Sequence, residues 1–130
     1  MNSCYCGRSM SYALCCGKIH KDISNAATAE DLMRSRYSAF VLAKGDYLLK
    51  SHHSTTRPSS KEKKSMVRWA KAVNWVKLEV LHTSKGTLQD TEGTVEFKAF
   101  YYDQDGLQMI HEHSTFTKEQ GYWVYVGEKQ

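Results

Sequence analysis

The sequence predicts an α+β fold, in which helices pack on one side of an antiparallel sheet and a short cysteine-rich segment comes first. Apolar residues recur at helical spacing between Thr28 and Val73, and they alternate with polar residues from Thr94 onward. All four cysteines lie within the first sixteen residues. We therefore expect a metal-binding or redox segment, then helices, then strands.

Length and composition are those of one ordinary domain with a small appendage. The chain has 130 residues, of which 41% are hydrophobic and 25% charged, close to the average of globular proteins. No stretch approaches the ~20 apolar residues of a membrane-spanning helix, and the first residues lack the basic head and apolar run of a signal peptide. We expect a cytoplasmic protein without a membrane segment.

The four cysteines follow the spacing C-x-C-x8-C-C, at Cys4, Cys6, Cys15 and Cys16. A disulfide within either close pair would be strained, whereas one metal ion accepts both pairs because the intervening loop can fold one over the other. Four thiolates complete a tetrahedral shell at ~2.3 Å and leave no position for water. The pattern therefore predicts a structural zinc ion, with four free or redox-active thiols as the alternative.

Neighbouring residues suit such a site. Gly7 and Gly17 each follow a ligand, where a turn can direct backbone N–H groups at sulfur. Arg8 and Lys18 offset the negative charge of a four-thiolate zinc site. That site would lower the net charge of the protein below its formal value of +4, so charge alone does not indicate a nucleic-acid partner. His20 could replace one cysteine as a ligand, but we expect a surface residue because four sulfurs complete the shell.

A first helix is predicted to begin after Thr28, with the acidic Asp31 three residues beyond this cap. Its apolar stripe consists of Met33, Tyr37, Phe40 and Val41. We expect Gly45 to end this helix and Asp46 to cap a second, short helix over residues 47–51.

Pro58 is expected in the first turn of a third helix, because the Arg57-Pro58 step favours extended backbone before it. The apolar side of that helix carries Met66, Trp69, Ala70 and Val73. A separate basic row consists of Lys64, Arg68 and Lys71. This row is either a solvated helix face or a surface that binds an anionic partner.

Four strands are predicted in the second half of the chain. Residues 75–82 are rich in β-forming side chains, and residues 94–102 alternate, with Val95, Phe97, Ala99 and Tyr101 on one face. Turns at 103–106 and 119–121 connect these strands to two more, at 109–117 and 122–126.

The cysteine segment resembles the SEC-C motif, named after the C-terminal zinc tail of the SecA translocase ATPase. Cys4-Tyr5-Cys6-Gly7 and Cys15-Cys16-Gly17 match its ligand positions, whereas residues 8–14 differ from its lysine-rich loop. The SecA tail binds the SecB chaperone and the ribosome. The resemblance therefore implies a protein or ribosomal partner.

Several separated motifs resemble the YchJ family, an uncharacterised bacterial family with an N-terminal SEC-C motif. They are LMRSRYSAF at 32–40, TRP at 56–58, GTVEF at 93–97, HEHSTF at 111–116 and GYWVYV at 121–126. The resemblance implies a zinc-binding segment at 1–20 and, at 21–130, a cone of curved antiparallel sheet and helices similar to nuclear transport factor two. The family has no assigned activity, and this fold hosts both enzymes and binding domains.

Candidate catalytic residues lie on two of the predicted strands. His111 and Glu112 are neighbours that face opposite sides of the sheet, so the one that faces inward could act as a general acid or base. Glu96 interrupts an apolar strand and is either a third candidate or the partner of a cross-strand Lys or His. A structural role in a polar network is the alternative for all three.

Four further residues could bind a ligand or a partner. Arg34 and Arg36 flank the apolar stripe of the first helix and could bind an anion or pair with one of the strand glutamates, Glu112 or Glu96. His53 and Arg57 bracket a Ser-Thr-Thr loop, which forms either the rim of a pocket or a turn with hydroxyl caps.

We expect a small zinc-binding protein that acts as a protein- or ribosome-interaction module, as a monomer or homodimer. The alternative is an enzyme whose cone pocket performs general acid–base chemistry of the isomerase, dehydratase or hydrolase type. Polar groups that converge in a closed pocket would favour the enzyme, and a filled core beside an exposed apolar or basic patch would favour the interaction module. No aromatic residues are interleaved with the basic row, which disfavours recognition of single-stranded nucleic acid.

Overall fold

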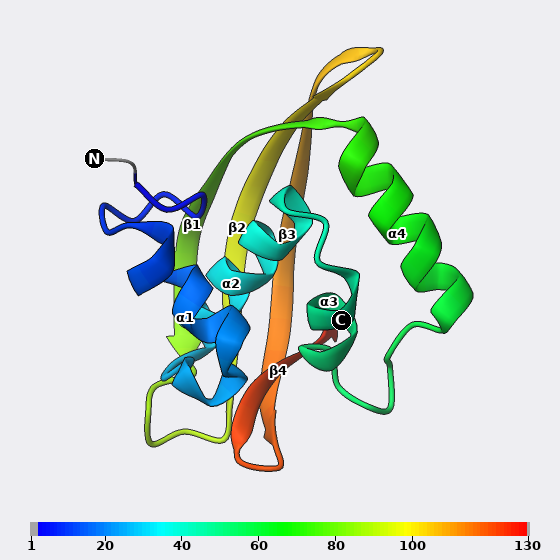
Figure 1. Ribbon diagram of the computed structural model, residues 1–130. Coiled ribbons are helices and arrows are strands. Elements are labelled where there is room, and N and C mark those ends of the chain that lie inside the picture. The colour runs from blue at the N-terminus through cyan, green and yellow to red at the C-terminus, as the bar shows by residue number, and fades with distance from the viewer. Residues whose placement is uncertain (1–2, 130) are drawn as a thin grey trace.

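Helices occupy the first half of the chain and strands the second half (Figure 1), which confirms the predicted α+β class. The computed structural model describes residues 3–129. In chain order its elements are η1 (Tyr12–Leu14, a 3₁₀ turn), α1 (Cys16–Lys21), η2 (Ile23–Asn25, a 3₁₀ turn), α2 (Ala29–Val41), α3 (Gly45–Lys50), α4 (Ser60–Ala72), β1 (Asn74–Lys85), β2 (Glu92–Asp103), β3 (Gly106–Glu119) and β4 (Tyr122–Glu128). Across these residues, none of the helices has the length and apolar character that a membrane crossing requires.

The four strands form one antiparallel sheet in the order β1-β2-β3-β4, so each strand pairs with its neighbours in sequence. The sheet curves around the helices (Figure 1). Helix α2 lies across the concave face, and α4 lies on the side away from α1, where it leads into β1. All four predicted strands are present, and each extends beyond at least one predicted end. This curved sheet with helices in its hollow is the expected cone.

The core lies between α2 and the concave face of β2 and β3. Val95, Phe97 and Ala99 of β2 are buried, as the alternating pattern predicts, because every second side chain of a strand faces the helices. Phe116 of β3 and Leu32 of α2 complete this centre, with 1% and 0% of their surfaces exposed. Burial of these apolar side chains is the main source of stability for the fold.

The start of α2 is predicted correctly and its end is not. Thr28 is the N-cap, and its hydroxyl accepts the Asp31 N–H at 3.0 Å. The chain leaves the helix at Ala43, which adopts the left-handed backbone conformation at φ 55°. Gly45 is instead the first residue of α3, where a Cβ would lie 2.7 Å from Val67 of α4. Close packing of two helices explains this glycine.

Two further cap predictions are wrong. Asp46 does not cap α3, whose N-cap is Lys44; the Asp46 carboxylate instead accepts a hydrogen bond from Lys63 of α4 at 2.8 Å. Pro58 precedes α4 rather than lying in its first turn, because Ser59 is the N-cap, forms a capping box with Glu62, and makes Ser60 the first residue of the helix.

Candidate metal centre and apolar pocket

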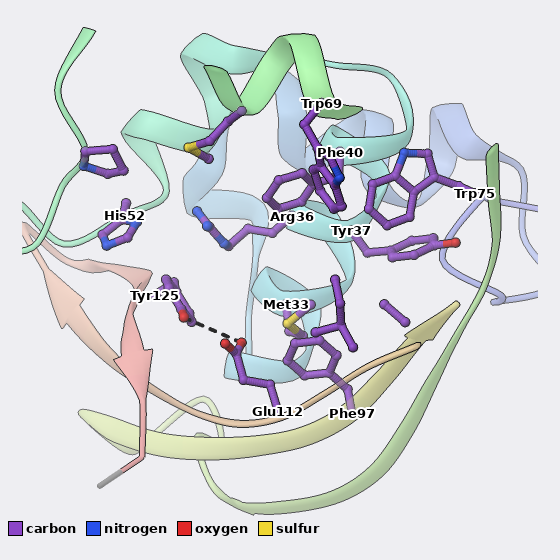
Figure 2. Close-up of a pocket in the computed structure, with 14 residues that line it drawn as sticks. Met33, Arg36, Tyr37, Phe40, His52, Trp69, Trp75, Phe97, Glu112 and Tyr125 are labelled. Atoms are coloured by element: carbon purple, nitrogen blue, oxygen red, sulfur yellow. Dashed lines mark hydrogen bonds between the residues drawn. The ribbon is translucent and has the colours of Figure 1, made fainter. Parts of the chain in front are cut away.

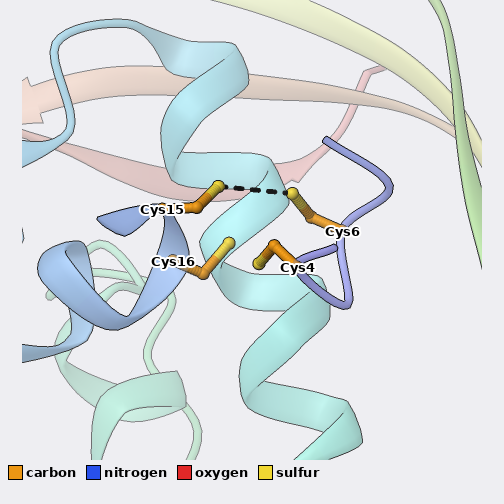
Figure 3. A group of neighbouring side chains, drawn as sticks. All are labelled: Cys4, Cys6, Cys15 and Cys16. Atoms are coloured by element: carbon orange, nitrogen blue, oxygen red, sulfur yellow. Dashed lines mark hydrogen bonds between the residues drawn. The ribbon is translucent and has the colours of Figure 1, made fainter. Parts of the chain in front are cut away.

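The four cysteines converge beside α2, where a loop and a 3₁₀ turn bring the two close pairs together (Figure 3). Cys4 and Cys6 lie in the loop before η1, Cys15 connects η1 to α1, and Cys16 is the first residue of α1. All four are buried, and their Sγ atoms lie within 4.8 Å of one another. Among residues 3–129, no other group of three or more metal-binding side chains is gathered in this way.

The distances between the sulfurs fit a tetrahedral metal ion. Metal–sulfur bonds of ~2.3 Å place two tetrahedral ligands ~3.8 Å apart. Cys6 Sγ lies 3.6 Å from Cys15 Sγ, much farther than the ~2.05 Å bond of a disulfide. The residues present can therefore hold a metal ion with four sulfur ligands and no open position for water.

Hydrogen bonds among the thiols favour one thiolate over the others. A hydrogen bond from the Cys16 thiol lowers the pKa of Cys6 to about 5, and the Arg8 backbone N–H also stabilises this sulfur as an anion. The same thiol contact raises the pKa of Cys16, while burial raises the pKa of Cys15 to about 11. A metal ion bound by all four sulfurs would therefore displace the protons of the thiols that are still protonated.

Two arginines attach the cysteine loop to α2. Arg8 pairs with Asp31 at 2.7 Å. Arg34 donates to the Cys6 carbonyl at 2.7 Å and pairs with Glu30 of its own helix at 2.9 Å. Arg34 therefore positions the cysteine loop, and its suggested pairing with a glutamate of the sheet is wrong.

His20 lies behind the cysteines and is more than half buried between α1 and α2. Its Nδ1 accepts the Tyr12 hydroxyl and its Nε2 donates to the Ser35 carbonyl, both at 2.7 Å, while its ring packs on Tyr47. The expected surface position is wrong, because η1 folds Tyr12 over this histidine. Gly17 allows that fold, since a Cβ there would lie 2.7 Å from the Tyr12 carbonyl oxygen.

A second candidate site is a cavity of about 290 Å³ between the concave face of the sheet and helices α2 and α4 (Figure 2). Five aromatic side chains form much of its wall: Tyr37, Phe40, Trp69, Trp75 and Phe97. Trp69 and Trp75 meet edge to face, with their ring centroids 5.3 Å apart. Trp69 is 36% exposed, so the wall opens toward solvent there. The apolar lining favours a ligand with an apolar body.

Polar side chains line the opposite end of the cavity, where Figure 2 shows Arg36, His52, Glu112 and Tyr125 close together. Glu112 Oε2 accepts the Ser114 hydroxyl at 2.8 Å and the Tyr125 hydroxyl at 3.5 Å. Glu112 therefore lies on the inner face of β3, which settles the orientation that alternation along this strand left open.

Arg36 is a buried cation at this polar end, with 5% of its surface exposed. Its Nη1 donates to the Leu48 carbonyl at 2.9 Å and to the Ser51 hydroxyl at 2.7 Å. Burial lowers the pKa of Arg36 to about 10, so it remains protonated at neutral pH. The suggested ion pair with Glu112 or Glu96 is wrong, since no carboxylate of residues 3–129 lies within ion-pair distance.

Sequence reasoning missed His52 and Tyr125. A backbone bridge joins His52, just after α3, to Tyr125 of β4, and the two rings meet edge to face at 5.1 Å. Burial lowers the pKa of His52 to about 4 and raises the pKa of Tyr125, so both are uncharged at neutral pH. Nothing in the sequence around His52 indicates that this histidine lines a cavity. Tyr125 pairs with the inward-facing Phe116, and knowledge of this strand pairing would have indicated that Tyr125 also faces inward.

Glu96 and His111 lie outside the cavity, on the convex face of the sheet. Their side chains pair at 2.7 Å, and this hydrogen bond lowers the pKa of Glu96. Glu96 is therefore the partner of a cross-strand histidine, as one of the two alternatives predicted. Neither residue can act on a molecule held in the cavity.

The remaining candidates also lie outside the cavity. His53 Nδ1 accepts from Thr55 at 2.8 Å, and its Nε2 faces Glu119 at 3.7 Å. Arg57 donates to the His52 carbonyl at 3.0 Å, so this loop is a hydrogen-bonded turn. The basic row of Lys64, Arg68 and Lys71 is exposed on α4.

Residues 28–128 match the family model described as the YchJ middle domain, which is NTF2-like. The chain belongs to the YchJ family. A UPF0225 protein of Streptomyces coelicolor is 43% identical over 122 residues, covering 94% of this chain and 90% of that protein. A UPF0225 protein of Vibrio vulnificus is 42% identical over 125 residues, covering 95% and 72%.

Two solved structures resemble this YchJ-family chain over almost its whole length. A SEC-C motif containing protein from Psychrobacter arcticus has 32% identity and a TM-score of 0.81, covering all of this chain and 84% of that one. A SEC-C motif containing protein from Rhodopseudomonas palustris, solved in solution, has 30% identity and a TM-score of 0.85, covering 98% of both chains. The cone and the cysteine segment therefore recur together.

Proposed function

We propose that this YchJ-family protein binds zinc through its four cysteines and binds a small, largely apolar molecule in the cavity of its cone. The cavity is the observation that carries the second half of the proposal. Well-packed protein interiors leave few voids larger than a water molecule, whereas this cavity has about 290 Å³ of space lined by aromatic rings, with polar groups at one end. Such a combination is typical of ligand sites.

Zinc is the ion that the cysteines favour. Tetrahedral sites with four thiolates are typical of structural zinc, because this ion accepts sulfur ligands and imposes no other geometry. Bound there, the ion would link the Cys4–Cys6 loop to the start of α1. With every position filled by sulfur its role would be structural, so we assign no reaction to it.

We divide the chain into a zinc segment, residues 1–20, and the cone, residues 21–130. Support comes from the family model, which begins at residue 28 and spans the whole sheet. The four cysteines pack in the same apolar cluster as Leu32 and Phe97, so the zinc segment supports one side of the cone.

Native mass spectrometry of protein purified without chelators tests both halves at once. We expect one zinc ion per chain, and we expect a fraction of molecules to retain an organic ligand. Protein without any metal would overturn the zinc proposal.

The cavity is tested with an uncharged fluorescent dye of two fused rings, 6-propionyl-2-(dimethylamino)naphthalene. Ala99→Leu adds three carbons to a cavity-lining position of β2 and should weaken dye binding at least tenfold. Lys98→Leu introduces the same side chain on the opposite face of the same strand and serves as the control. Equal dye affinity in both variants and the native protein would contradict binding in the cavity.

Acid–base catalysis in the same cavity is a second candidate, of the isomerase, dehydratase or hydrolase type. The position of Glu112 favours it, because among residues 3–129 this is the one carboxylate that lines the cavity. A molecule retained by the native protein would then be converted on incubation with native protein and left unchanged by Glu112→Gln. Conversion by both proteins would exclude Glu112 as the catalytic base.

The exposed basic row of α4 favours a further candidate, an interaction with an anionic partner such as the ribosome. Charge reversal at Lys64, Arg68 and Lys71 should abolish co-sedimentation with ribosomes, and added salt should weaken it in the native protein. Co-sedimentation that persists in the reversed variant would exclude this surface.

A further inference from the structure

We propose that the cavity selects an uncharged ligand with an amide-type edge, a carbonyl oxygen beside an N–H group, as in a carboxamide or lactam. The carbonyl would accept from Arg36 and the N–H would donate to Glu112. This inference rests on the proposed ligand function of the cavity and names the chemical class that the polar end recognises.

Arg36 supplies the donors. A guanidinium group has five N–H bonds, and the two on Nη1 are taken by the Leu48 carbonyl and the Ser51 hydroxyl. The three on Nε and Nη2 make no hydrogen bond to residues 3–129, and neither atom is sealed from solvent by protein. Arg36 is 95% buried, lines the cavity, and holds its guanidinium 4.6 Å from the centroid of the Tyr125 ring. We therefore infer that a ligand in the cavity can reach these unused donors.

Glu112 supplies the acceptor. Both of its hydrogen bonds, from Ser114 and from Tyr125, go to Oε2. Its Oε1 accepts no hydrogen bond from the described part of the chain, and it is likewise open to the cavity. The two side chains lie at the same end of the cavity (Figure 2) and form no ion pair with each other. Tyr125 contacts both, because its ring lies 4.6 Å from Arg36 Cζ and its hydroxyl donates to Glu112. A ligand group that accepts from Arg36 and donates to Glu112 would bind beside Tyr125.

The charges at the polar end balance, which excludes a charged ligand as the preferred one. Arg36 contributes one positive charge and Glu112 one negative charge, while His52 and Tyr125 are neutral. A carboxylate ligand would place a second anion beside Glu112, and an ammonium ligand a second cation beside Arg36. Burial makes either like-charge contact costly.

The size of the cavity limits the apolar body. Its volume of about 290 Å³ is roughly twice the ~150 Å³ of an engineered cavity that binds benzene. The body should therefore be the size of two fused rings. Trp75 and Phe97 offer it flat aromatic contact.

Four naphthalenes that differ at one position test this class: naphthalene-2-carboxamide, 2-naphthoate, 2-naphthylmethylamine and 2-methylnaphthalene. Affinities are measured by displacement of the fluorescent dye and by shifts of the indole N–H signals in ¹H–¹⁵N spectra. We expect the carboxamide to bind at least about 100-fold more tightly than the methyl compound, as two hydrogen bonds to charged groups would give. We expect both charged probes to bind more weakly than the carboxamide.

Glu112→Gln separates recognition from mere packing. The substitution keeps the shape of the side chain but leaves Arg36 as an unbalanced cation. The order of the probes should therefore invert, with 2-naphthoate binding more tightly than the carboxamide. His111→Gln changes the adjacent residue on the convex face and should leave the native order intact.

The outcomes distinguish this inference from the proposed function. If the methyl compound binds as tightly as the carboxamide, or Glu112→Gln leaves the order unchanged, the amide-type ligand is wrong and the apolar cavity stands. If none of the four probes shifts the tryptophan signals, the cavity is not a ligand site; this inference and the ligand half of the proposed function then both fail, and the zinc proposal stands.

Discussion

A methyl group added at Gly17 should weaken metal binding without touching a ligand. In Gly17→Ala the new Cβ would lie 2.7 Å from the Tyr12 carbonyl oxygen and 2.9 Å from the Tyr12 ring. Tyr12 cannot move alone, because that carbonyl accepts the Cys15 N–H at 3.0 Å and its hydroxyl is bound to His20. Displacement of Tyr12 would therefore displace a metal ligand.

The magnitude follows from these contacts. Ordinary carbon contacts lie at ~3.5 Å or more, so the turn must shift by roughly 0.5–1 Å. Overpacking of this kind costs about 1–3 kcal/mol, of which the better helix propensity of alanine returns up to about 1 kcal/mol. A cost in the middle of this range, about 2 kcal/mol, leaves a net loss of about 1–2 kcal/mol, which corresponds to metal affinity weakened about 5- to 30-fold.

Competition for Zn²⁺ between the protein and a chromophoric chelator measures this affinity. Gly127→Ala is the matched control, because a Cβ there would meet nothing within 4 Å. We expect the control to match the native protein. An affinity of Gly17→Ala within twofold of native would refute the argument that Tyr12 transmits the strain to Cys15.

Three other changes test the remaining parts of the structure. Cys15→Ser should abolish stoichiometric zinc binding and speed amide hydrogen exchange in residues 3–21, whereas loss of protection across β2 as well would contradict the two-part division. Leu32→Ala should lower the free energy of unfolding in urea by about 2–5 kcal/mol, because this side chain is 0% exposed; a loss below 1 kcal/mol would contradict its central place in the core. His52 should titrate at about pH 4 in the folded protein, because burial lowers its pKa. The unfolded chain takes up that proton near pH 6.5, so stability should fall between about pH 6.5 and pH 4 and the fall should be smaller in His52→Phe.

The convergence of the four cysteines and the inner face of β2 could be predicted from sequence because each follows a local pattern. Four cysteines in two close pairs admit few arrangements, and the alternation of Val95, Phe97 and Ala99 leaves one face for the core. The orientation of β3 could not be derived in this way, since both of its faces carry polar side chains. The orientation of β3 is set by Phe116, which packs against the core. Glu112 lies on the same face of the strand as Phe116 and therefore also points inward.

Features set by contacts between distant segments escaped prediction. Gly45 is of the residue type that often ends a helix, but here glycine is required because α3 packs closely against α4. The sequence around Arg36 does not indicate its hydrogen-bond partners, because the carbonyl and the hydroxyl that accept from it belong to α3 and the residue that follows it. The polar end of the cavity exists only once α2, α3 and β4 have met, so no stretch of sequence contains it.

The position of the cysteine loop has a consequence for self-association. β1 is a twelve-residue strand with a partner on one side only, and an unpaired strand edge can recruit a second chain. The loop lies beside this strand (Figure 1), and a Cβ on Gly7 would lie 3.8 Å from the Leu78 carbonyl oxygen. An ion that orders the loop would therefore also shield the edge. Chelation should raise light scattering at temperatures where the circular dichroism of the sheet is still unchanged.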